Sequence, residues 1–325
     1  MMSPLTARPL PALTRLAGLI IAALLAVVGL WVPGAATVPA QAAPGDAECT
    51  SPDCDSVLVA ELSEDLESYL RARGSPEHAS AAALSVSLPG EETSVDVSAG
   101  TMQFRGSAPV PADSVWQIGS NTKAFTSVLL LQLEAEGRLS IEDTVGRWLP
   151  QYPQWRDVTI RRLLNMTSGI PTYDEQSAFL ADYAADPFVR FSKERLVGYV
   201  ADLPATSGYG YSNTNYILAE MIIERVTGDS YRDELYERIV EPLGLSDLDY
   251  RPHLYPRLIV SRQPAGYLYF NQVPEFSRMV GRDVSRDTVS WGRGAGGILS
   301  TMSDLTRWAW ACTPASCCLR SSSSS

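Results

Sequence analysis

The 325 residues are enough for one large domain or two small ones, and 45% of them are hydrophobic, which suffices for a core. The formal net charge of −11 at neutral pH opposes binding to phosphate backbones and anionic membrane surfaces, so we expect no nucleic-acid partner. The two histidines, His78 and His253, sit in no recognisable constellation, which argues against a histidine-based triad and a hydrolytic metal site; we expect no metal and no cofactor.

Residues 1–42 have the pattern of an export signal. Two arginines precede an uncharged run at 16–32, and the small-x-small sequence Ala-Gln-Ala at 40–42 offers a cleavage site. A retained membrane anchor is the alternative, because the run is long for a signal core, although two glycines weaken it as a span. We expect cleavage after Ala42 and a secreted or cell-envelope protein.

The five cysteines fall into two groups. Cys49 and Cys54 lie close together and could form a small-loop disulfide in an oxidising compartment, a pairing that their spacing leaves open. The other three belong to residues 312–325, which end in five serines and match nothing upstream in composition. We expect this tail to be out of frame; a metal-binding tail is the alternative, but one short cluster supplies too few ligands.

The first elements after the signal are a helix and a hairpin. Residues 57–73 carry apolar side chains at helical spacing and end at Gly74, which predicts a helix with a glycine stop. Residues 82–88 and 93–97 predict two strands joined around Pro89-Gly90.

A block of helices follows the hairpin. The predicted helices are 120–137, a short helix opened by 140–143, 159–164, 174–185, 192–203, 213–227, 231–239 and one from about Ser303. Strands that precede a run of helices indicate an α+β fold with a mostly helical subdomain inserted after the first strands.

The stretch Gly-Ser-Asn-Thr-Lys at 119–123 is the first candidate for chemistry. Ile118-Gly119 looks extended and a helix-prone apolar run follows, so Ser120 is expected at a helix start. Lys123 then lies on the same helix face, and its amine can reach the Ser120 oxygen. The chain has 26 Lys and Arg together, of which only Lys123 and Lys193 are lysines. Since arginine cannot lose its proton, a lysine at 123 suggests a base rather than a solvated charge beside a capping serine.

The second candidate is Tyr211-Ser-Asn213. Two residues separated by two on an extended or turning segment can point the same way. A phenol near an ammonium ion has its ionised form favoured, so Tyr211 could share the proton-accepting task or pass a proton to the leaving group. Asn213 could bond a substrate amide. Taken alone, the triplet is more often a packed tyrosine and a helix-capping asparagine.

Together these stretches resemble the serine β-lactamase family, closest to class C β-lactamases and the related D-alanyl-D-alanine carboxypeptidases and esterases. Ser-x-x-Lys is a known signature of such enzymes, and Tyr-x-Asn follows about 90 residues later in the right order. Residues 158–169 (VTIRRLLNMTSG) are similar to the family's ITIRHLLSHTSG segment, with Met166 where a histidine is usual. Residues 294–304 (GAGGILSTMSD) are similar to its AGGLxSTxxDL segment.

The resemblance implies an antiparallel sheet flanked by helices and an acyl-transfer mechanism. Ser120 would attack a carbonyl with help from Lys123 and Tyr211, and its own N–H would supply half of an oxyanion hole. Lys123 and Tyr211 are expected to titrate as a coupled pair, which leaves the main base open. The substrate would be a peptidoglycan peptide, a β-lactam or an ester, with Asn213 and Trp291 in the binding pocket; a core position for Trp291 is the alternative.

The pattern breaks after residue 304. The family has a third motif, His/Lys-x-Gly, on a central strand that lines the site, and no such triplet follows here. Two hypotheses therefore stand for residues 43–311: a secreted serine hydrolase, or a non-catalytic remnant or binding module that lacks the C-terminal strands and helix. Because each oxyanion donor is typically worth ~3 kcal/mol, we expect the chain as written to be weakly active or inactive, and poorly folded.

Overall fold

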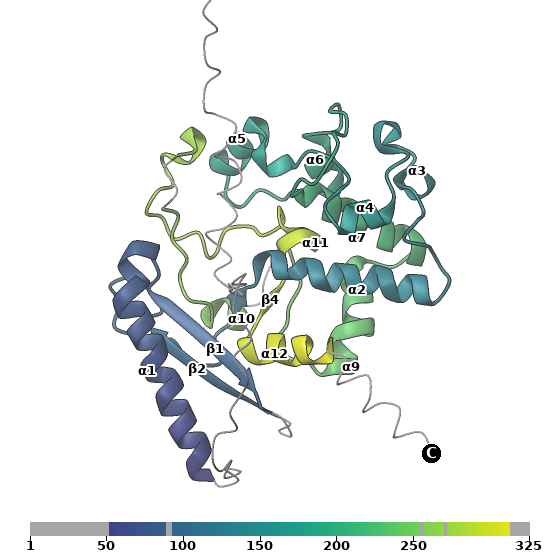
Figure 1. The fold of residues 1–325 in the computed structure, drawn as a ribbon. Coiled ribbons are helices and arrows are strands. Elements are labelled where there is room, and N and C mark those ends of the chain that lie inside the picture. The colour runs from purple at the N-terminus through teal and green to yellow at the C-terminus, as the bar shows by residue number, and fades with distance from the viewer. Residues whose placement is uncertain (1–51, 89–92, 254–256, 270–271, 313–325) are drawn as a thin grey trace, which may run out of the picture. The chain divides into compact units, whose positions relative to one another are not determined.

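The computed structural model describes residues 52–88, 93–253, 257–269 and 272–312, all within the unit Gly45–Ser325 (Figure 1). The predicted export signal, Cys49, the side chain of Cys54 and the serine-rich tail lie outside the described residues, so the predictions made for them stay predictions. No helix in the described part of the chain combines the length and the apolar character needed to cross a membrane.

Helix α1 (Pro52–Glu77) runs past the glycine expected to stop it. The helix ends where His78 adopts a left-handed φ of 55° and the Ala79 N–H bonds to the Gly74 carbonyl at 2.9 Å. A Cβ at Gly74 would lie 2.9 Å from the Ala79 carbonyl oxygen. Glycine at position 74 therefore leaves room for the Ala79 carbonyl. The prediction of a stop at Gly74 is wrong, because the helix ends about one turn later.

The predicted hairpin is present as β1 (Ala81–Ser87) and β2 (Ser94–Gly100). The strands pair antiparallel, from Ala81 opposite Gly100 to Ser87 opposite Ser94. Both α1 and α12 (Met302–Ala311) contact this hairpin, so helices flank the sheet (Figure 1). Among the described residues, no third strand pairs with β1 or β2.

A second, very short sheet brings two distant motifs together. Strand β3 (Trp116–Gln117) pairs antiparallel with β4 (Leu299–Ser300). Directly after β3, the Ile118 N–H bonds to the Ile298 carbonyl at 3.1 Å. This pairing lays the start of the Ser-x-x-Lys helix beside the glycine-rich segment.

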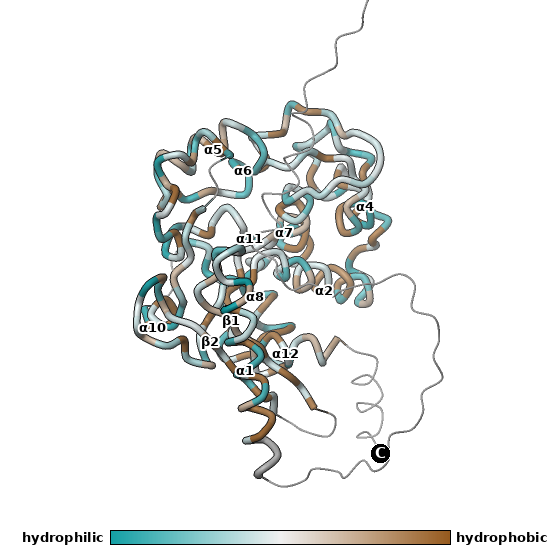
Figure 2. The backbone as a smooth tube through the Cα atoms, turned by 60° about the vertical axis from the view of Figure 1, so that its left-hand side comes forward, coloured by the Kyte–Doolittle hydropathy of each residue, from teal (hydrophilic) through white to brown (hydrophobic). Residues whose placement is uncertain are grey.

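The core lies around helices α2 (Thr122–Ala135) and α7 (Asn213–Thr227), which are in contact. Apolar side chains of α2 recur at helical spacing and are fully buried, and α7 is buried over its first eleven residues. Figure 2 shows the hydrophobic stretches of these helices and of α4 (Ile160–Leu164) within the helical region. Helix α7 matches its predicted range at both ends, and Gly228 closes its C-terminal end in a left-handed conformation (φ 88°).

Shorter helical segments complete the fold. They are α3 (Val145–Trp148), η5 (Pro153–Trp155), η6 (Tyr173–Glu175), α5 (Ser177–Ala185), α6 (Lys193–Gly198), α8 (Tyr231–Leu235), η7 (Tyr236–Val240), α9 (Glu241–Leu243), α10 (Arg257–Ser261), η8 (Pro274–Phe276) and α11 (Arg293–Gly296).

Other predicted helix boundaries are also wrong. The helix predicted for 174–185 begins only at Ser177, because Gln176 is extended after the 3-10 turn η6. Residues 140–143 form a turn and the helix begins only at Val145, since Thr144 pairs with Thr159 in a β-bridge. Helix α6 ends at Gly198 rather than at 203, because the next residues form turns in which the Tyr199 and Val200 N–H groups bond three residues back, to the Leu196 and Val197 carbonyls. The helix from residue 231 widens into a π turn ahead of Pro242, whose ring cannot follow a regular α-helix.

Candidate active site

Ser120 occupies a tight turn rather than a capping position. Gly119 has a left-handed φ of 51°, and the single 3-10 turn Gly119–Asn121 precedes α2. The expectation that Ile118-Gly119 is extended is therefore wrong, because β3 ends at Gln117. A residue with a Cβ rarely adopts this φ, which accounts for the glycine. The turn leaves Ser120 half-buried, with its side chain toward Lys123.

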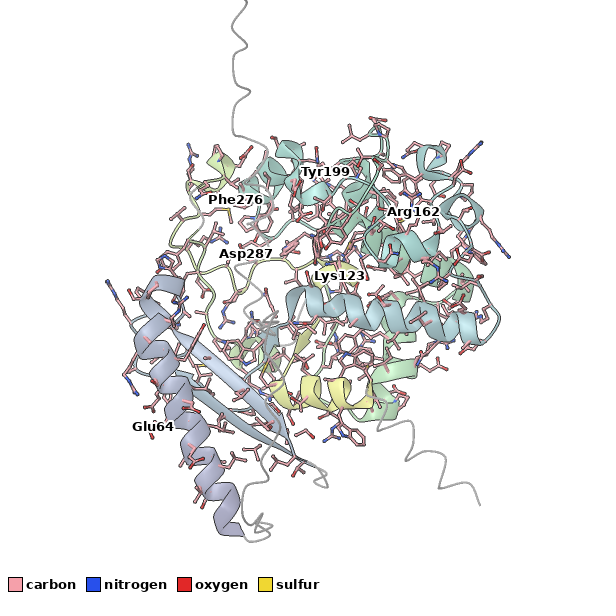
Figure 3. All side chains as sticks on the ribbon, in the orientation of Figure 1. Glu64, Lys123, Arg162, Tyr199, Phe276 and Asp287 are labelled. Atoms are coloured by element: carbon pink, nitrogen blue, oxygen red, sulfur yellow. The ribbon has the colours of Figure 1, made fainter. Side chains whose placement is uncertain are left out.

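Lys123 is buried among oxygen acceptors at the N-terminal end of α2 (Figure 3). Its Nζ lies 3.0 Å from Ser120 Oγ, 2.7 Å from Asn213 Oδ1 and 2.7 Å from the Ala295 carbonyl oxygen. Burial lowers the pKa of Lys123 to about 7, although Asp174 acts in the opposite direction. Two of the three acceptors are carbonyl oxygens that can only accept, so a neutral amine donates to both and turns its lone pair to the Ser120 hydroxyl.

Tyr211 contacts the same serine oxygen from the other side. Its hydroxyl donates to Ser120 Oγ at 2.6 Å, and Lys123 Nζ lies 4.9 Å from the centre of its ring. Burial raises the pKa of Tyr211. The hydrogen bond to Ser120 lowers it by less than burial raises it, and the charge of Asp174 raises it further. The expectation that a neighbouring lysine favours the ionised phenol is therefore wrong, because desolvation of the phenol has the largest effect on its pKa.

Asn213 is held by residues that the sequence analysis missed. Its Nδ2 donates to Asp174 Oδ2 at 2.9 Å, and its backbone N–H donates to Thr172 Oγ1 at 3.1 Å. The Thr172 hydroxyl also donates to Asp174. Both residues come directly after the family-like segment 158–169, and that position is the signal that could have drawn attention to them.

The Ala295 carbonyl is the third feature that sequence reasoning missed. Side chains of two helices fix the neighbouring residue, since the Gly294 N–H bonds to Glu220 Oε2 at 2.8 Å and the Thr126 hydroxyl bonds to the Gly294 carbonyl at 2.7 Å. A Cβ at Gly294 would lie 3.2 Å from Glu220 Cβ, so the glycine allows this close approach. Backbone acceptors carry no sequence signal of their own.

Trp291 is placed differently from the other predicted site residues. It is partly buried against the core, and its carbonyl accepts a hydrogen bond from the Tyr173 hydroxyl. Within the described part of the chain, no hydrogen bond or ring contact joins its indole to Ser120 or Lys123. The packing fits the core alternative, and a substrate-binding role for Trp291 stays a prediction.

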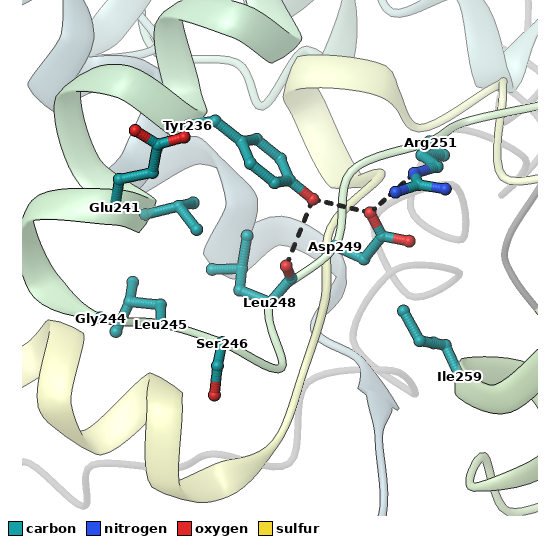
Figure 4. A pocket seen from close by; sticks show the side chains of 10 residues that line it. Tyr236, Glu241, Gly244, Leu245, Ser246, Leu248, Asp249, Arg251 and Ile259 are labelled. Carbon is teal, nitrogen blue, oxygen red and sulfur yellow. Dashed lines mark hydrogen bonds and ion pairs between the residues drawn. The ribbon is translucent and has the colours of Figure 1, made fainter.

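No group of three or more His, Cys, Asp or Glu side chains in the described ranges is arranged to hold a metal ion. A cavity of about 360 Å³ lies around Tyr236, Asp249 and Arg251 (Figure 4). Asp249 Oδ1 there accepts from the Tyr236 hydroxyl at 2.7 Å and pairs with Arg251 Nε at 3.3 Å. None of the predicted site residues lines this cavity, so it is separate from the Ser120 cluster.

Comparison with known proteins agrees with the geometry at the level of the family. Residues 66–320 match the family model described as Beta-lactamase. The chain belongs to the β-lactamase family. The predicted family is therefore confirmed, and the predicted α+β class agrees with relatives of this fold.

Two curated relatives are penicillin-binding proteins. Penicillin-binding protein 4* of Bacillus subtilis (strain 168) is 36% identical over 169 residues, which are 50% of this chain and 36% of that protein. Penicillin-binding protein 4 of Amycolatopsis lactamdurans is 30% identical over 237 residues, 71% of this chain and 59% of that protein. The β-lactamase-family chain thus spans between about a third and three fifths of these relatives.

Solved structures extend the likeness. D-amino acid amidase from Ochrobactrum anthropi SV3, complexed with L-phenylalanine amide, is 27% identical with a TM-score of 0.65; the match covers 78% of this chain and 70% of that one. A class C β-lactamase is 19% identical with a TM-score of 0.61, covering 80% and 67% of the two chains, and shows the fold alone.

Proposed function

We propose that this β-lactamase-family chain is a serine hydrolase that forms an acyl-enzyme on Ser120. Its substrates would be peptide, β-lactam or ester carbonyls, as in D-alanyl-D-alanine carboxypeptidases and β-lactamases. The observation that carries the proposal is the position of Ser120 Oγ, which accepts a hydrogen bond from the Tyr211 hydroxyl at 2.6 Å and lies 3.0 Å from the Lys123 amine. A pKa of about 7 leaves much of this amine neutral at neutral pH, when it can accept the serine proton.

The reaction follows from these contacts. Lys123 takes the proton of Ser120 as Oγ forms a bond to the substrate carbonyl carbon, and the new ammonium keeps the Asn213 and Ala295 oxygens as acceptors. The bond from the carbonyl carbon to the leaving nitrogen or oxygen then breaks, as the neutral Tyr211 hydroxyl gives that atom a proton and is reprotonated from Lys123. Water next attacks the ester carbonyl while Lys123 accepts its proton, and the bond from the acyl carbon to Oγ breaks as Ser120 regains a proton and the acid is released.

A covalent labelling experiment tests the proposal. The full chain is incubated with a fluorophosphonate and a fluorescent penicillin, and the adduct is located by mass spectrometry. We expect an adduct on Ser120, none in Ser120→Ala, and an unchanged yield in Ser127→Ala, whose hydroxyl lies on α2 and contacts Tyr216 instead. An adduct that survives Ser120→Ala contradicts the proposal, and no adduct in the wild-type chain favours the non-catalytic alternative.

A second candidate function concerns amides with a free amine beside the scissile carbonyl. The half-buried Asp174 carboxylate bonds to Asn213 and acts electrostatically on both Lys123 and Tyr211, so it lies beside the reacting groups. A carboxylate there attracts a substrate ammonium and repels a substrate carboxylate. Solved relatives named D-amino acid amidase have 25–27% identity to this chain. We therefore propose amides of D-amino acids as one substrate class.

Paired substrates separate this second candidate from the first. We expect D-phenylalanine p-nitroanilide to react at least about tenfold faster than its N-acetyl derivative, and Asp174→Asn to remove most of that preference. Glu175→Gln is the matched control, because the neighbouring Glu175 is exposed and has no hydrogen bond to Asn213 among the contacts described. Equal rates for the two anilides in the wild-type chain contradict the amide proposal and leave the acyl-enzyme proposal intact.

A further inference from the structure

Met166 has a backbone conformation that its side chain does not favour. Its φ is +62°, in the left-handed region that few residues with a Cβ adopt, and it is 7% exposed. Such outliers persist only where the surrounding structure holds them. Met166 also stands where the resemblance places a histidine, so its chemistry differs from the family pattern at this position.

The strained residue holds both neighbours of Tyr211. The Gly210 N–H donates to the Met166 carbonyl oxygen at 2.9 Å. The Ser212 N–H lies 3.5 Å from Met166 Sδ, and Asn215 Nδ2 lies 3.6 Å from the same sulfur. Thioether sulfur is a weak acceptor, but the N–H groups on either side of Tyr211 are thus bonded to one buried residue.

We infer that Met166 is a positioning residue for Tyr211, which uses its left-handed backbone and its thioether to aim the phenol at Ser120. The inference rests on the proposed acyl-enzyme function. Tyr211 is 37% exposed and its hydroxyl bonds to Ser120 at 2.6 Å, so the flanking peptide bonds help to fix the direction of a side chain that is not enclosed by packing. A misplaced donor slows a reaction that depends on its position.

A double-mutant cycle separates positioning from general packing. Met166→Leu keeps the size and apolar character but removes the acceptor, and Met166→Gln restores an acceptor through its amide oxygen. We expect Met166→Leu to slow acylation of Ser120 by the fluorescent penicillin roughly 3- to 10-fold, the range of one ordinary hydrogen bond, with Met166→Gln recovering most of the loss. In a Tyr211→Phe background the same change should alter the rate less than about 2-fold. Met221→Leu is the matched control, because Met221 is also 7% exposed and lies on α7.

The possible outcomes are distinct. A loss that persists in the Tyr211→Phe background, or one that Met221→Leu reproduces, shows a packing effect and overturns the inference while the proposed function stands. A wild-type chain that is not labelled on Ser120 overturns both. Amide hydrogen exchange on the wild-type chain tests the inference even where a Met166 variant fails to fold. The Ser212 N–H should exchange at least about tenfold more slowly than an unprotected amide. An unprotected Ser212 N–H overturns the inference.

Discussion

The two lysines of this chain lie in two different buried environments. Lys123, on α2, contacts a hydroxyl and two carbonyl oxygens, and none of its hydrogen bonds goes to a carboxylate. Lys193, at the start of α6, bonds to the Glu224 carboxylate and lies 3.9 Å from Glu220 Oε1. Both side chains are largely removed from water, so the partners distinguish the two sites.

The difference teaches what makes a lysine suited to accept a proton. A carboxylate at bonding distance stabilises the ammonium form, whereas neutral acceptors in a buried site leave the cost of desolvation uncompensated. The pKa of Lys123 is accordingly lowered to about 7. The scarcity of lysine in the sequence drew attention to Lys123. Scarcity does not by itself identify a proton acceptor, because Lys193 is the other lysine of the same chain. The partners of the amine distinguish the two residues.

The largest expected effect separates the two lysines directly. Lys123→Arg should reduce labelling of Ser120 by at least about 10³-fold, because a guanidinium keeps the charge but cannot accept the proton. Lys193→Arg keeps a cation beside Glu224 and should change the labelling rate less than about 3-fold. Single-turnover acylation rates measure both. Similar losses in the two variants would mean that charge or packing, rather than proton acceptance, explains Lys123.

The next largest effect on rate is expected from removing the Tyr211 hydroxyl. Tyr211→Phe should slow acylation and deacylation by about 10²-fold, because the ring remains and only the proton donor is lost. Tyr216→Phe is the control: its ring also lies near Lys123, at 5.4 Å, but its hydroxyl bonds to the Leu164 carbonyl. An unchanged rate in Tyr211→Phe would remove the phenol from proton transfer.

The rate should also depend on pH in a defined direction. Only the neutral form of Lys123 accepts a proton, so the acylation rate should rise about tenfold per pH unit below about 7 and level off above it. Asp174 raises the pKa of Lys123, so Asp174→Asn should move the midpoint to lower pH. Labelling rates between pH 5 and 9 test this, and a midpoint that moves upward in Asp174→Asn would contradict the assigned electrostatics.

The smallest effects are on stability and have opposite signs. The pKa of Lys123 is lower in the folded than in the unfolded chain, so unfolding takes up a proton between about pH 7 and 10.5. The wild-type chain therefore becomes more stable as the pH rises through that range. Lys123→Met should therefore be more stable than wild type at pH 7, with the difference shrinking towards pH 10. Lys193→Met should lose about 1 kcal/mol by leaving Glu224 without its cation. Urea unfolding at both pH values measures these changes, and a destabilised Lys123→Met would contradict the account.

Sequence reasoning succeeded where the relevant interaction is local. Ser120 and Lys123 are three residues apart on adjoining helical turns, so their spacing alone predicted the 3.0 Å contact between Oγ and Nζ. The C-terminal end of α7 was also predictable, because Gly228 provides a left-handed cap. The catalytic roles of these residues remain predictions.

Sequence reasoning failed where contacts between residues far apart in the chain determine the geometry of the site. The Ala295 carbonyl bonds to an amine 172 residues away and has no side chain to reveal it. Asp174 became visible as a partner of Asn213 only when the fold joined η6 to α7. The direction of the Tyr211 pKa shift depended on burial, which the motif alone does not show. Gly74 was misread for a similar reason, since the close approach of Ala79 determines its role.

The measurement that tests the central claim most directly is an NMR titration of Lys123. A chain labelled with ¹³C at the lysine ε-carbon gives two side-chain signals, because it contains only two lysines. The signal that disappears in Lys123→Arg and remains in Lys193→Arg belongs to Lys123. We expect it to titrate with a midpoint near 7. A midpoint near the ordinary value of 10.5 would show that the amine is protonated at neutral pH, and would contradict its assignment as the proton acceptor.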